Sequence, residues 1–575
     1  MRNLHHISLK NFLNSYLINQ AQLKAIQQNN NLFIEIPLAN QDEKLRVHID
    51  SISLSYRYQF KFPVLLVKTD QTSKELANDQ VIEILLQNLA QRYSVADEKL
   101  KRLKKAISNS DYNLQLSLDK LPQTQIKSLY QTKLDFAESE SALIAGHQMH
   151  PTPKSCTGFS EEEFCQYYPE FKQKFQLHYF MVKSNHLYFK TNLKQSSDTL
   201  IKQYFVSDRD DHAESLIPLH PWQAAYLLRL PQIQQMIKGD LLIDLGARGE
   251  YFSASSSIRS VYAQNSPFML KMSLNVMITN SVRINYEREL ERAIAVDKFW
   301  QTDIAKEIQK DYPQFSAITD PAFLCLLDSN GKLIEESALL FRHNPFMESG
   351  NNVSCLAALC HDSILSQGNR FDSLIANISQ KYALNTQQSA ELWLDKFLSI
   401  CIEPLLWILS YYGIALEAHQ QNLLVKLDTD GLPIYCYYRD SQGYYISEDA
   451  MRCYPEHAEI FGTFANGTTE FVNHHFSYYL IGNSLLGIIN GLSSSKEINE
   501  QALINNVQDK FKSWQHKWQD APYDFLSFLL TRSTLPYKDN LATRLNDLDE
   551  LTAPLAQQSI YSELDNPFYC LNKGN

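Results

Sequence analysis

The first part of the chain alternates between hydrophobic and polar residues over short stretches. Residues 31–38 (NLFIEIPL) alternate with the period of a β-strand. Residues 45–68 are rich in β-branched and aromatic side chains, as expected for two or three antiparallel strands, and they include Pro63. Residues 96–107 instead place apolar side chains at helical spacing beside a lysine-rich face. These patterns predict an N-terminal part that mixes strands with helices.

The middle of the chain changes from strand-like to helical patterns. Residues 175–188 alternate as strands, and residues 251–286 have the pattern of a strand, a loop and a strand. Helical periodicity dominates residues 287–310. Further on, residues 422–427 and 433–438 are strand-like runs separated by turn residues, which predicts a hairpin. The remainder is mainly helical in pattern, so the predicted fold class is α+β with a mainly helical C-terminal part.

A long apolar stretch precedes this hairpin. Residues 387–416 have helical periodicity, and residues 397–416 approach the length of a membrane-spanning helix. Glu403 and Pro404 would be costly at the middle of a bilayer, and basic flanks are missing, so we interpret the stretch as a buried helix. The N-terminus also lacks the apolar core of a signal peptide. These features predict a cytoplasmic protein with no membrane partner.

Composition narrows the possible classes of protein. The 575 residues are 44% hydrophobic, which excludes intrinsic disorder and predicts packed cores. The formal charge of −11 is opposite to the basic footprint of a general nucleic-acid binder. Nine cysteines without a CxxC pair argue against a disulfide scaffold or a zinc ribbon. The group Cys355, Cys360, His361 and Asp362 is interpreted as a helix that carries buried thiols rather than as a metal site.

Glycine is scarce, with 17 residues in the whole chain. The Walker pattern GxxxxGK[ST] and the pattern GxGxxG are both missing from the sequence. A nucleotide would therefore have to be held by something other than a glycine-rich loop.

Hydroxyl and cationic side chains between residues 255 and 283 offer such an alternative. The loop Ser255–Ser260 (SSSIRS) combines hydroxyl donors with Arg259, whose guanidinium is a bidentate donor to phosphate. Lys271 and Arg283 follow at intervals of twelve residues, along strand-like text. A lysine within an apolar strand is seldom buried without an anionic partner. Either the three cations converge on a polyanion, or they pair with acidic side chains or reach solvent.

A second cluster follows the long apolar helix. Glu417, His419 and Asn422 lie close together in the sequence, and Asp440 follows the predicted hairpin. The hard oxygens of Glu417, Asn422 and Asp440 suit Mg²⁺, which takes one or two carboxylates together with substrate phosphates, and His419 could hold or polarise a carboxylate. The order resembles that of a kinase catalytic loop, but glutamines stand where the kinase aspartate base would be.

The loop of residues 146–158 (GHQMHPTPKSCTG) is a third candidate. His147, His150 and Lys154 could bind an anionic carboxylate, although a merely well-ordered loop is an equal alternative. The two histidines have an i, i+3 spacing, but no third zinc ligand is evident nearby.

Taken in order, these stretches resemble a known family. GHQMHPTPKSCTG, HPWQ, SSSIRS, the Lys271 strand, ITNSVR, EAHQQNLLV and YYRDSQG are similar to motifs of the siderophore synthetases that work independently of nonribosomal peptide synthetases, the aerobactin synthetase (IucA/IucC) family. The resemblance spans residues 146–443. Two departures stand out: the family often has Pro at the position of Gln148 and Thr at that of Ser260.

The resemblance implies a fold and an activity. It implies a cupped-hand architecture of thumb (1–140), fingers (141–390) and palm (391–575), and a homodimer. The implied reaction is adenylation of a carboxylate, most often of citrate, by ATP with Mg²⁺, followed by attack of an amine or alcohol. The implied ATP contacts are Ser257, Arg259, Ser260, Lys271, Asn422 and Asp440; the carboxylate contacts are Thr279, Arg283, His419, His147, His150 and Lys154; the Mg²⁺ ligands are Glu417, Asn422 and Asp440. Lys271, Arg283 and His419 are the implied catalytic residues.

Two other functions compete with this one. A small-molecule kinase would fit the order of His419, Asn422 and Asp440. A ferric-siderophore binding or reducing protein is the third hypothesis, since C-terminal parts of the family resemble an iron reductase. Iron–sulfur chemistry would need clustered cysteines near the C-terminus, and only Cys570 lies in the last hundred residues.

Overall fold

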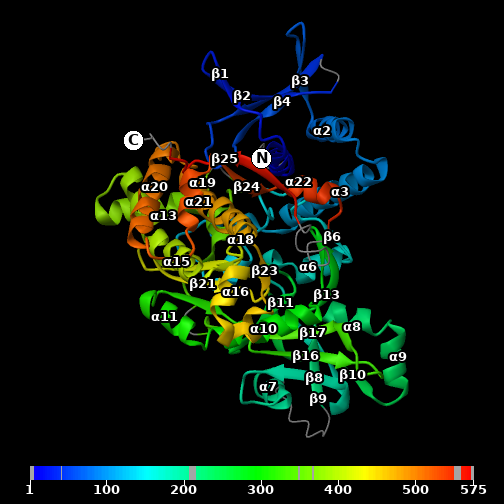
Figure 1. Cartoon of the computed structure of the whole chain (residues 1–575). Coiled ribbons are helices and arrows are strands. Elements are labelled where there is room, and N and C mark those ends of the chain that lie inside the picture. Colours follow the sequence, from blue (N-terminus) through cyan, green and yellow to red (C-terminus); the bar gives the residue numbers. More distant parts are fainter. Residues whose placement is uncertain are drawn as a thin grey trace.

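The computed structural model of the chain describes residues 6–39, 42–205, 215–347, 350–365, 368–548 and 559–570. The N-terminal part is a five-stranded antiparallel sheet with helices beside it (Figure 1). Its elements are α1 (Ile7–Asn19), β1 (Ala25–Gln28), β2 (Asn31–Pro37), β3 (Glu43–Ile49), β4 (Phe60–Lys68), β5 (Ser73–Leu76), α2 (Asn78–Tyr93) and α3 (Asp97–Lys120). The alternation in β2 and β3 sends one face of each strand into a core shared with α1 and α2, as the sequence pattern predicted.

Short helices precede and interrupt the strands of a second, larger sheet. These are α4 (Gln123–Ser128), α5 (Phe136–Glu140), α6 (Glu161–Tyr167), α7 (Ser197–Tyr204), α8 (Pro221–Leu227) and α9 (Pro231–Lys238). The sheet has the strand order β8-β16-β17-β12-β11-β10-β7-β9 and antiparallel pairing. Its strands are β7 (Lys174–Val182), β8 (Leu187–Thr191), β9 (Ser215–Leu219), β10 (Leu242–Ala254), β11 (Ser260–Tyr262), β12 (Phe268–Met272), β16 (Ala322–Leu327) and β17 (Leu333–His343). The central strand β12, which carries Lys271, is buried along its whole length.

Three small sheets connect the large sheet to the C-terminal helices. One is β14-β13-β6, of β6 (Cys156–Thr157), β13 (Leu274–Ile278) and β14 (Ser281–Arg283). Another is β15-β21-β20-β18, of β15 (Phe315–Ile318), β18 (Val353–Cys355), β20 (Leu423–Leu427) and β21 (Pro433–Arg439). The third is β19-β22-β23, of β19 (Ile414–Leu416), β22 (Tyr444–Ser447) and β23 (Ala465–Gly467). The predicted hairpin is the antiparallel pair β20–β21.

Helices dominate the rest of the described chain. They are α10 (Glu287–Phe299), α11 (Asp303–Asp311), α12 (Leu356–Cys360), α13 (Arg370–Tyr382), α14 (Thr386–Phe397), α15 (Glu403–Tyr412), α16 (Glu448–Cys453), α17 (Ala458–Phe461), α18 (Thr469–Phe476), α19 (Leu486–Leu492), α20 (Glu500–Lys517) and α21 (Phe525–Thr531). The segments Leu398–Ile402 and Ser477–Leu485 are π-helical. Such segments are rare in proteins and occur frequently at functional sites.

The long apolar stretch is the buried centre of the helical part, as predicted. Trp393, Phe397 and Leu405 belong to the largest hydrophobic cluster and have no exposed surface. The expected helix ends four residues early, at Tyr412: Gly413, with a φ of 64°, terminates α15, and the next three residues form β19. Among the described helices, none has the length and apolar character required to span a bilayer.

The C-terminal end of the chain returns to the N-terminal part. The hairpin β24 (Thr534–Lys538) and β25 (Tyr561–Asp565) and the helix α22 (Asn540–Leu545) lie beside α1 and α3 (Figure 1). Leu541 and Leu545 of α22 pack within the hydrophobic cluster of the N-terminal sheet. Both ends of the described chain therefore contribute to the same core, while the three-part division at residues 140 and 390 stays a prediction.

Candidate active site

A cavity of about 570 Å³ lies where the sheets, the C-terminal helices and the N-terminal part meet. Every candidate residue from the sequence lines it: His147, His150, Lys154, Ser257, Arg259, Ser260, Lys271, Thr279, Arg283, Glu417, His419, Asn422 and Asp440. The three sequence clusters, which span almost 300 positions, are thus parts of one site. A cavity of this size holds a small ligand with most of its surface buried.

The lining of the cavity is strongly cationic. Ten lysine and arginine side chains contribute to it, against four acidic ones. The chain as a whole has a formal charge of −11, so this concentration of positive charge is local. Field lines focused in a low-dielectric cleft favour an anionic ligand.

The serine-rich loop joins β10 to β11 and forms one wall of the cavity. The Ser257 hydroxyl accepts a hydrogen bond from the Ser260 backbone N–H at 3.3 Å. Ile258 between them has a φ of 68°, a left-handed conformation that is rare for a β-branched residue. Such backbone strain costs on the order of 1–3 kcal/mol and clusters at functional sites. The loop is therefore held in a specific shape that presents hydroxyls to the cavity.

A buried carboxylate, which the sequence analysis did not identify, fixes this loop from behind. Glu140, at the end of α5, has no exposed surface and accepts hydrogen bonds at 2.9 Å from both the backbone N–H and the hydroxyl of Ser256. It also forms an ion pair with Arg439 at 2.9 Å. Glu140 therefore couples the serine-rich loop to the end of β21, next to Asp440.

Arg259 and Arg283 are held by neutral oxygen atoms. Arg259 donates to the Asn285 side-chain oxygen at 2.9 Å and to the Arg283 backbone carbonyl at 3.3 Å. Burial lowers the pKa of Arg259 to about 10, which leaves it charged at neutral pH. Arg283 donates to the Thr279 hydroxyl at 3.1 Å, and Thr279 itself has a φ of 55°. These contacts orient both guanidinium groups.

Lys271 and Asp440 form the central ion pair. The Lys271 ammonium lies 3.0 Å from Asp440 Oδ1, and an Arg342 guanidinium nitrogen lies 3.9 Å from the same oxygen. Burial by itself would raise the pKa of Asp440, but Lys271 and Arg342 outweigh it and hold that pKa well below its usual range. Burial lowers the pKa of Lys271, and Asp440 opposes the change. For Lys271 the structure thus shows the second of the two alternatives raised by the sequence, pairing with an acidic side chain.

His419 is a neutral hydrogen-bond donor to the cavity. Its Nδ1 accepts hydrogen bonds from the backbone N–H groups of Gln421 and Asn422 at 3.2 and 3.3 Å. Burial lowers its pKa to about 4, so the ring is neutral at pH 7 and its proton resides on Nε2. Nε2 lies 3.9 Å from Glu417 Oε1. A neutral N–H donor of this kind suits an uncharged or anionic oxygen of a ligand.

The three candidate residues in the loop of residues 146–158 contribute differently to the cavity. The Lys154 ammonium lies 2.5 Å from Glu170 Oε1, with both side chains buried, and 4.3 Å from the centre of the Tyr168 ring. Its charge is therefore compensated within the protein, which makes it the weaker candidate for a substrate contact. His147 and His150 accept backbone hydrogen bonds through Nδ1 at 3.1 and 3.0 Å. His147 Nε2 also lies 3.5 Å from the Asn483 side-chain nitrogen.

Gln148 stands where the family that this sequence resembles often has proline. It links this loop to α12 by a hydrogen bond. Its side-chain amide donates to the Cys360 backbone carbonyl at 3.4 Å, and the neighbouring His361 Nε2 donates to the Gly146 carbonyl at 3.0 Å. The HPWQ motif, by contrast, supports the fold: His220 is fully buried and caps α8 through the Trp222 N–H. As predicted, Cys360 is a buried thiol at the end of a helix.

The candidate Mg²⁺ ligands supply hard oxygens but no preformed cage. Gly443 allows their segments to approach, since a Cβ there would lie 2.4 Å from the Glu417 Cβ. Among the described residues, no group of three or more His, Cys, Asp or Glu side chains is arranged to hold a metal. Mg²⁺ needs only one or two carboxylates when substrate phosphates and waters complete its octahedron. The carboxylates of Glu417 and Asp440 with the Asn422 side-chain oxygen fit that requirement.

Several residues of the site were not identified from the sequence. Arg342 lies on β17. Its guanidinium donates two hydrogen bonds to the Asp320 carboxylate, from Nε at 2.7 Å and from Nη2 at 3.0 Å. Asn285 is fully buried and joins Arg259 to the Lys271 backbone carbonyl. Glu289 of α10 lines the cavity, and burial raises its pKa while Arg259 and Lys271 oppose the rise. A buried arginine or glutamate within an apolar strand or helix was the available signal, but its partner could not be deduced.

Comparison with known proteins places the chain in a family. A family model described as the IucA / IucC family matches residues 135–361, and one described as a ferric iron reductase FhuF-like transporter matches residues 391–553. The chain is 33% identical over 454 residues to a spermidine-citrate ligase of Bacillus anthracis, covering 76% of this chain and 74% of that protein. It is 35% identical over 451 residues to the rhizobactin siderophore biosynthesis protein RhbC of Rhizobium meliloti (strain 1021), covering 76% of each.

A solved structure agrees over nearly the whole length. The structure of ATP-bound aerobactin synthetase IucA from a hypervirulent pathotype of Klebsiella pneumoniae superposes with a TM-score of 0.90 at 25% identity. The match covers 98% of this chain and 99% of that one. With relatives of this identity and coverage, and with the site motifs gathered around one cavity, the chain belongs to the IucA / IucC family.

Proposed function

We propose that the protein is an ATP-dependent ligase that joins a carboxylate, citrate in the first instance, to an amine or an alcohol in siderophore biosynthesis. The observation that carries the proposal is the convergence of Arg259, Lys271 and Arg283 with the neutral donor His419 on one cavity. Polycarboxylate and polyphosphate both need such a cationic lining. The curated relatives named as citrate ligases support citrate as the acid, and the ATP-bound relative supports ATP.

The family resemblance implies adenylation of the carboxylate, and the charges in the cavity suit that reaction. A carboxylate oxygen of citrate attacks the α-phosphorus of ATP, and pyrophosphate leaves. The two reactants are both anionic, so fixed cations lower the barrier by offsetting their repulsion. Ser257, Ser260 and Arg259 would hold phosphate oxygens, and Lys271 would neutralise the α-phosphate. Thr279, Arg283 and His419 would orient citrate, with His147, His150 and Lys154 as further contacts.

The second half of the reaction needs no covalent protein nucleophile. The amine or hydroxyl of the co-substrate attacks the acyl carbon of the adenylate, an amide or ester forms, and AMP leaves. Exclusion of water from the buried cavity would protect the acyl adenylate from hydrolysis. Glu417, Asn422 and Asp440 would hold Mg²⁺, which supplies further positive charge at the phosphates. We also expect a homodimer that works in the cytoplasm, where ATP is available.

The test identifies the nucleotide product. Purified protein is incubated with ATP, Mg²⁺, citrate and a panel of amines, and the products are separated by chromatography and mass spectrometry. Citrate-dependent formation of AMP and pyrophosphate with a citryl amide is the expected result. Stable ADP with a phosphorylated acceptor would instead identify a kinase. Formation of AMP without any dependence on a carboxylate would contradict the ligase.

A further inference from the structure

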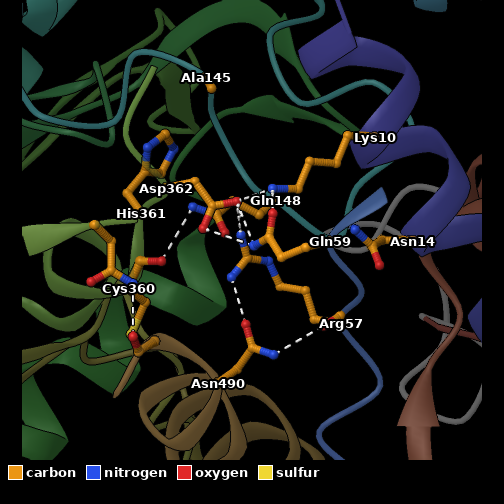
Figure 2. Close-up of polar contacts among 12 residues, drawn as sticks. Lys10, Asn14, Arg57, Gln59, Ala145, Gln148, Cys360, His361, Asp362 and Asn490 are labelled. Atoms are coloured by element: carbon orange, nitrogen blue, oxygen red, sulfur yellow. Dashed lines mark hydrogen bonds and ion pairs between the residues drawn. The ribbon is translucent and has the colours of Figure 1, made fainter. Parts of the chain in front are cut away.

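A buried polar network joins the N-terminal part to one side of the cavity (Figure 2). At its centre is Asp362, which follows α12 and forms ion pairs with both Lys10 of α1 and Arg57 of the loop before β4. The Gln59 side chain adds a hydrogen bond to Asp362 Oδ2 at 3.3 Å. Burial alone would raise the pKa of Asp362, but Arg57 and Lys10 hold it well below its usual range. The trio thus has two formal positive charges against one negative charge.

The two cations of this network differ in one respect. Arg57 contributes to the lining of the cavity, whereas Lys10 is not among the residues that line it. Arg57 is 8% exposed and donates through Nη1 to the Asn490 side-chain oxygen at 2.7 Å. Within the part of the chain that the structure describes, its buried Nε–H has no hydrogen-bond partner. The guanidinium group of Arg57 therefore belongs to the wall of the cavity, and a guanidinium is the side-chain group best suited to bind a carboxylate or a phosphate.

The helical run that carries Asn490 contacts both Arg57 and the residue next to His419. Asn483, seven positions earlier, accepts a hydrogen bond at 2.9 Å from the Gln420 backbone N–H, next to His419. Both asparagines line the cavity. Asn483 lies in the π-helical segment Ser477–Leu485, and Asn490 lies further along the same helical run, in α19. Arg57 and the segment next to His419 therefore contact different positions of one helical run that lines the cavity.

We propose that Arg57 binds a carboxylate at the far end of the amine co-substrate, while the amine itself reaches the citryl adenylate near His419. This proposal rests on the proposed ligase function and adds the class of the second substrate. Two kinds of molecule share the required chemistry: an amino acid with a free amine, and an amine that already carries one citryl group. A plain polyamine would place an ammonium against Arg57, which disfavours it in this orientation.

Ornithine and putrescine provide matched substrates, because they differ only by the carboxylate. The variant Arg57→Gln removes the cation from the cavity but keeps an amide near Asn490 and Asp362. The control Lys10→Gln removes the other cation of the same network away from the cavity. For each protein, citrate-dependent exchange of pyrophosphate into ATP measures the first half-reaction without any amine. Initial rates with each amine, and the ratio of bis-citryl to mono-citryl putrescine, measure the second half-reaction.

Arg57→Gln is expected to lose about tenfold to a hundredfold in kcat/KM for the carboxylate-bearing amine, as for loss of a hydrogen bond to a charged group. If the amino acid is the natural source of the carboxylate, the loss appears with ornithine and not with putrescine. If a citryl amine is the source, the variant accumulates mono-citryl putrescine. In both cases the loss in overall condensation exceeds the loss in pyrophosphate exchange, and Lys10→Gln behaves like the wild type.

Other outcomes would overturn the proposal. Equal effects of Arg57→Gln and Lys10→Gln would show that the network acts only on the structure. Unchanged kinetics for ornithine together with an unchanged bis-citryl to mono-citryl ratio would show that Arg57 contacts no substrate. If Arg57→Gln does not fold, Arg57→Lys keeps the charge but loses the planar fork, and a smaller loss of the same kind is expected. Absence of citrate-dependent exchange in the wild type would contradict the ligase function itself.

Discussion

The ammonium of Lys271 and the carboxylate of Asp440 lie 3.0 Å apart, although 169 positions separate them in the sequence. The register of β12 against β11 pairs Lys271 with Ser260, which places the ammonium beside the serine-rich loop. Asp440 follows the end of β21 and is also close to Arg342. A cation that is already buried and oriented costs little reorganisation when negative charge develops next to it.

Lys271→Ala should therefore slow adenylation more than it weakens ATP binding. We expect a loss of about 10²–10³-fold in the rate of citrate-dependent pyrophosphate exchange, the range found when one preorganised donor is removed. Exchange rates measured over a range of ATP concentrations separate kcat from KM. A variant that raises only KM for ATP would assign Lys271 to uniform binding of ground and transition states.

Arg283→Ala should abolish synthesis while the fold is kept. The Arg283 side chain donates to the Ile278 carbonyl, at the end of β13, and to the Thr279 hydroxyl, in the turn before β14. Its loss removes a proposed citrate contact but leaves the adjacent hydrophobic clusters intact. Product formation by mass spectrometry is the measurement, with circular dichroism as the control for folding. Unchanged turnover with citrate would exclude Arg283 as a carboxylate ligand.

His419 should make stability depend on pH. Its pKa is about 4 in the fold against 6.5 in the unfolded chain, so between these values only the unfolded state binds the proton. The contribution of His419 to stability is complete above about pH 6.5 and is lost as the pH falls to about 4. Replacing it by Gln should reduce the slope of the unfolding free energy against pH by about 1.4 kcal/mol per unit in this window.

Denaturant titrations of the wild type and His419→Gln at several pH values measure this slope. His516→Gln, on the exposed side of α20, controls for the substitution itself. An identical slope in the wild type and His419→Gln would mean that His419 is already protonated in the folded protein near pH 6.

Glu140→Ala should destabilise the fold and disorder the serine-rich loop. It leaves the buried guanidinium of Arg439 without its carboxylate, and breaking a buried ion pair from one side costs about 3–5 kcal/mol. It also removes both hydrogen bonds to Ser256. Thermal unfolding measures the first effect, and KM for ATP in pyrophosphate exchange measures the second. Wild-type values for both would contradict the role assigned to Glu140.

Gly487→Ala tests the packing of α19 against the site. A Cβ at this position would lie 1.9 Å from the Gln420 side-chain nitrogen, so Gln420 must move. The Gln420 side chain donates a hydrogen bond to the Asn483 backbone carbonyl at 2.7 Å, and Gln420 directly follows His419. We expect reduced exchange activity with a modest loss of thermal stability. In the double variant Gly487→Ala/Gln420→Ala, stability should recover because the clash is absent; a still lower stability would locate the strain elsewhere.

The sequence predicted local elements well where a period was clear. The alternation of residues 31–38, the helical spacing of residues 96–107 and the hairpin around residues 428–431 all correspond to observed elements. The end of the long apolar helix was missed because β19 is equally apolar, so hydrophobicity alone could not distinguish it from the helix. Only the left-handed conformation of Gly413 marks the change.

The candidate site was predictable as a set of residue types but not as a geometry. Hydroxyls and cations near one another in the sequence, together with the order of the motifs, identified the residues that line the cavity. Their partners were not predictable. Glu140 and Arg439 are almost 300 positions apart, and Asp362 meets Lys10 and Arg57 across more than 300.

The sequence by itself determined the periods of the strands and helices, the charge of the chain and the chemistry available to the site, because those properties depend on residues close together in the chain. Only the tertiary structure decided that these groups converge on one cavity, that His419 is neutral and that Arg57 rather than Lys10 reaches the ligand space. Burial and ion pairing arise from the packing of distant segments, and together they set the pKa values and the strength of the charges in the site.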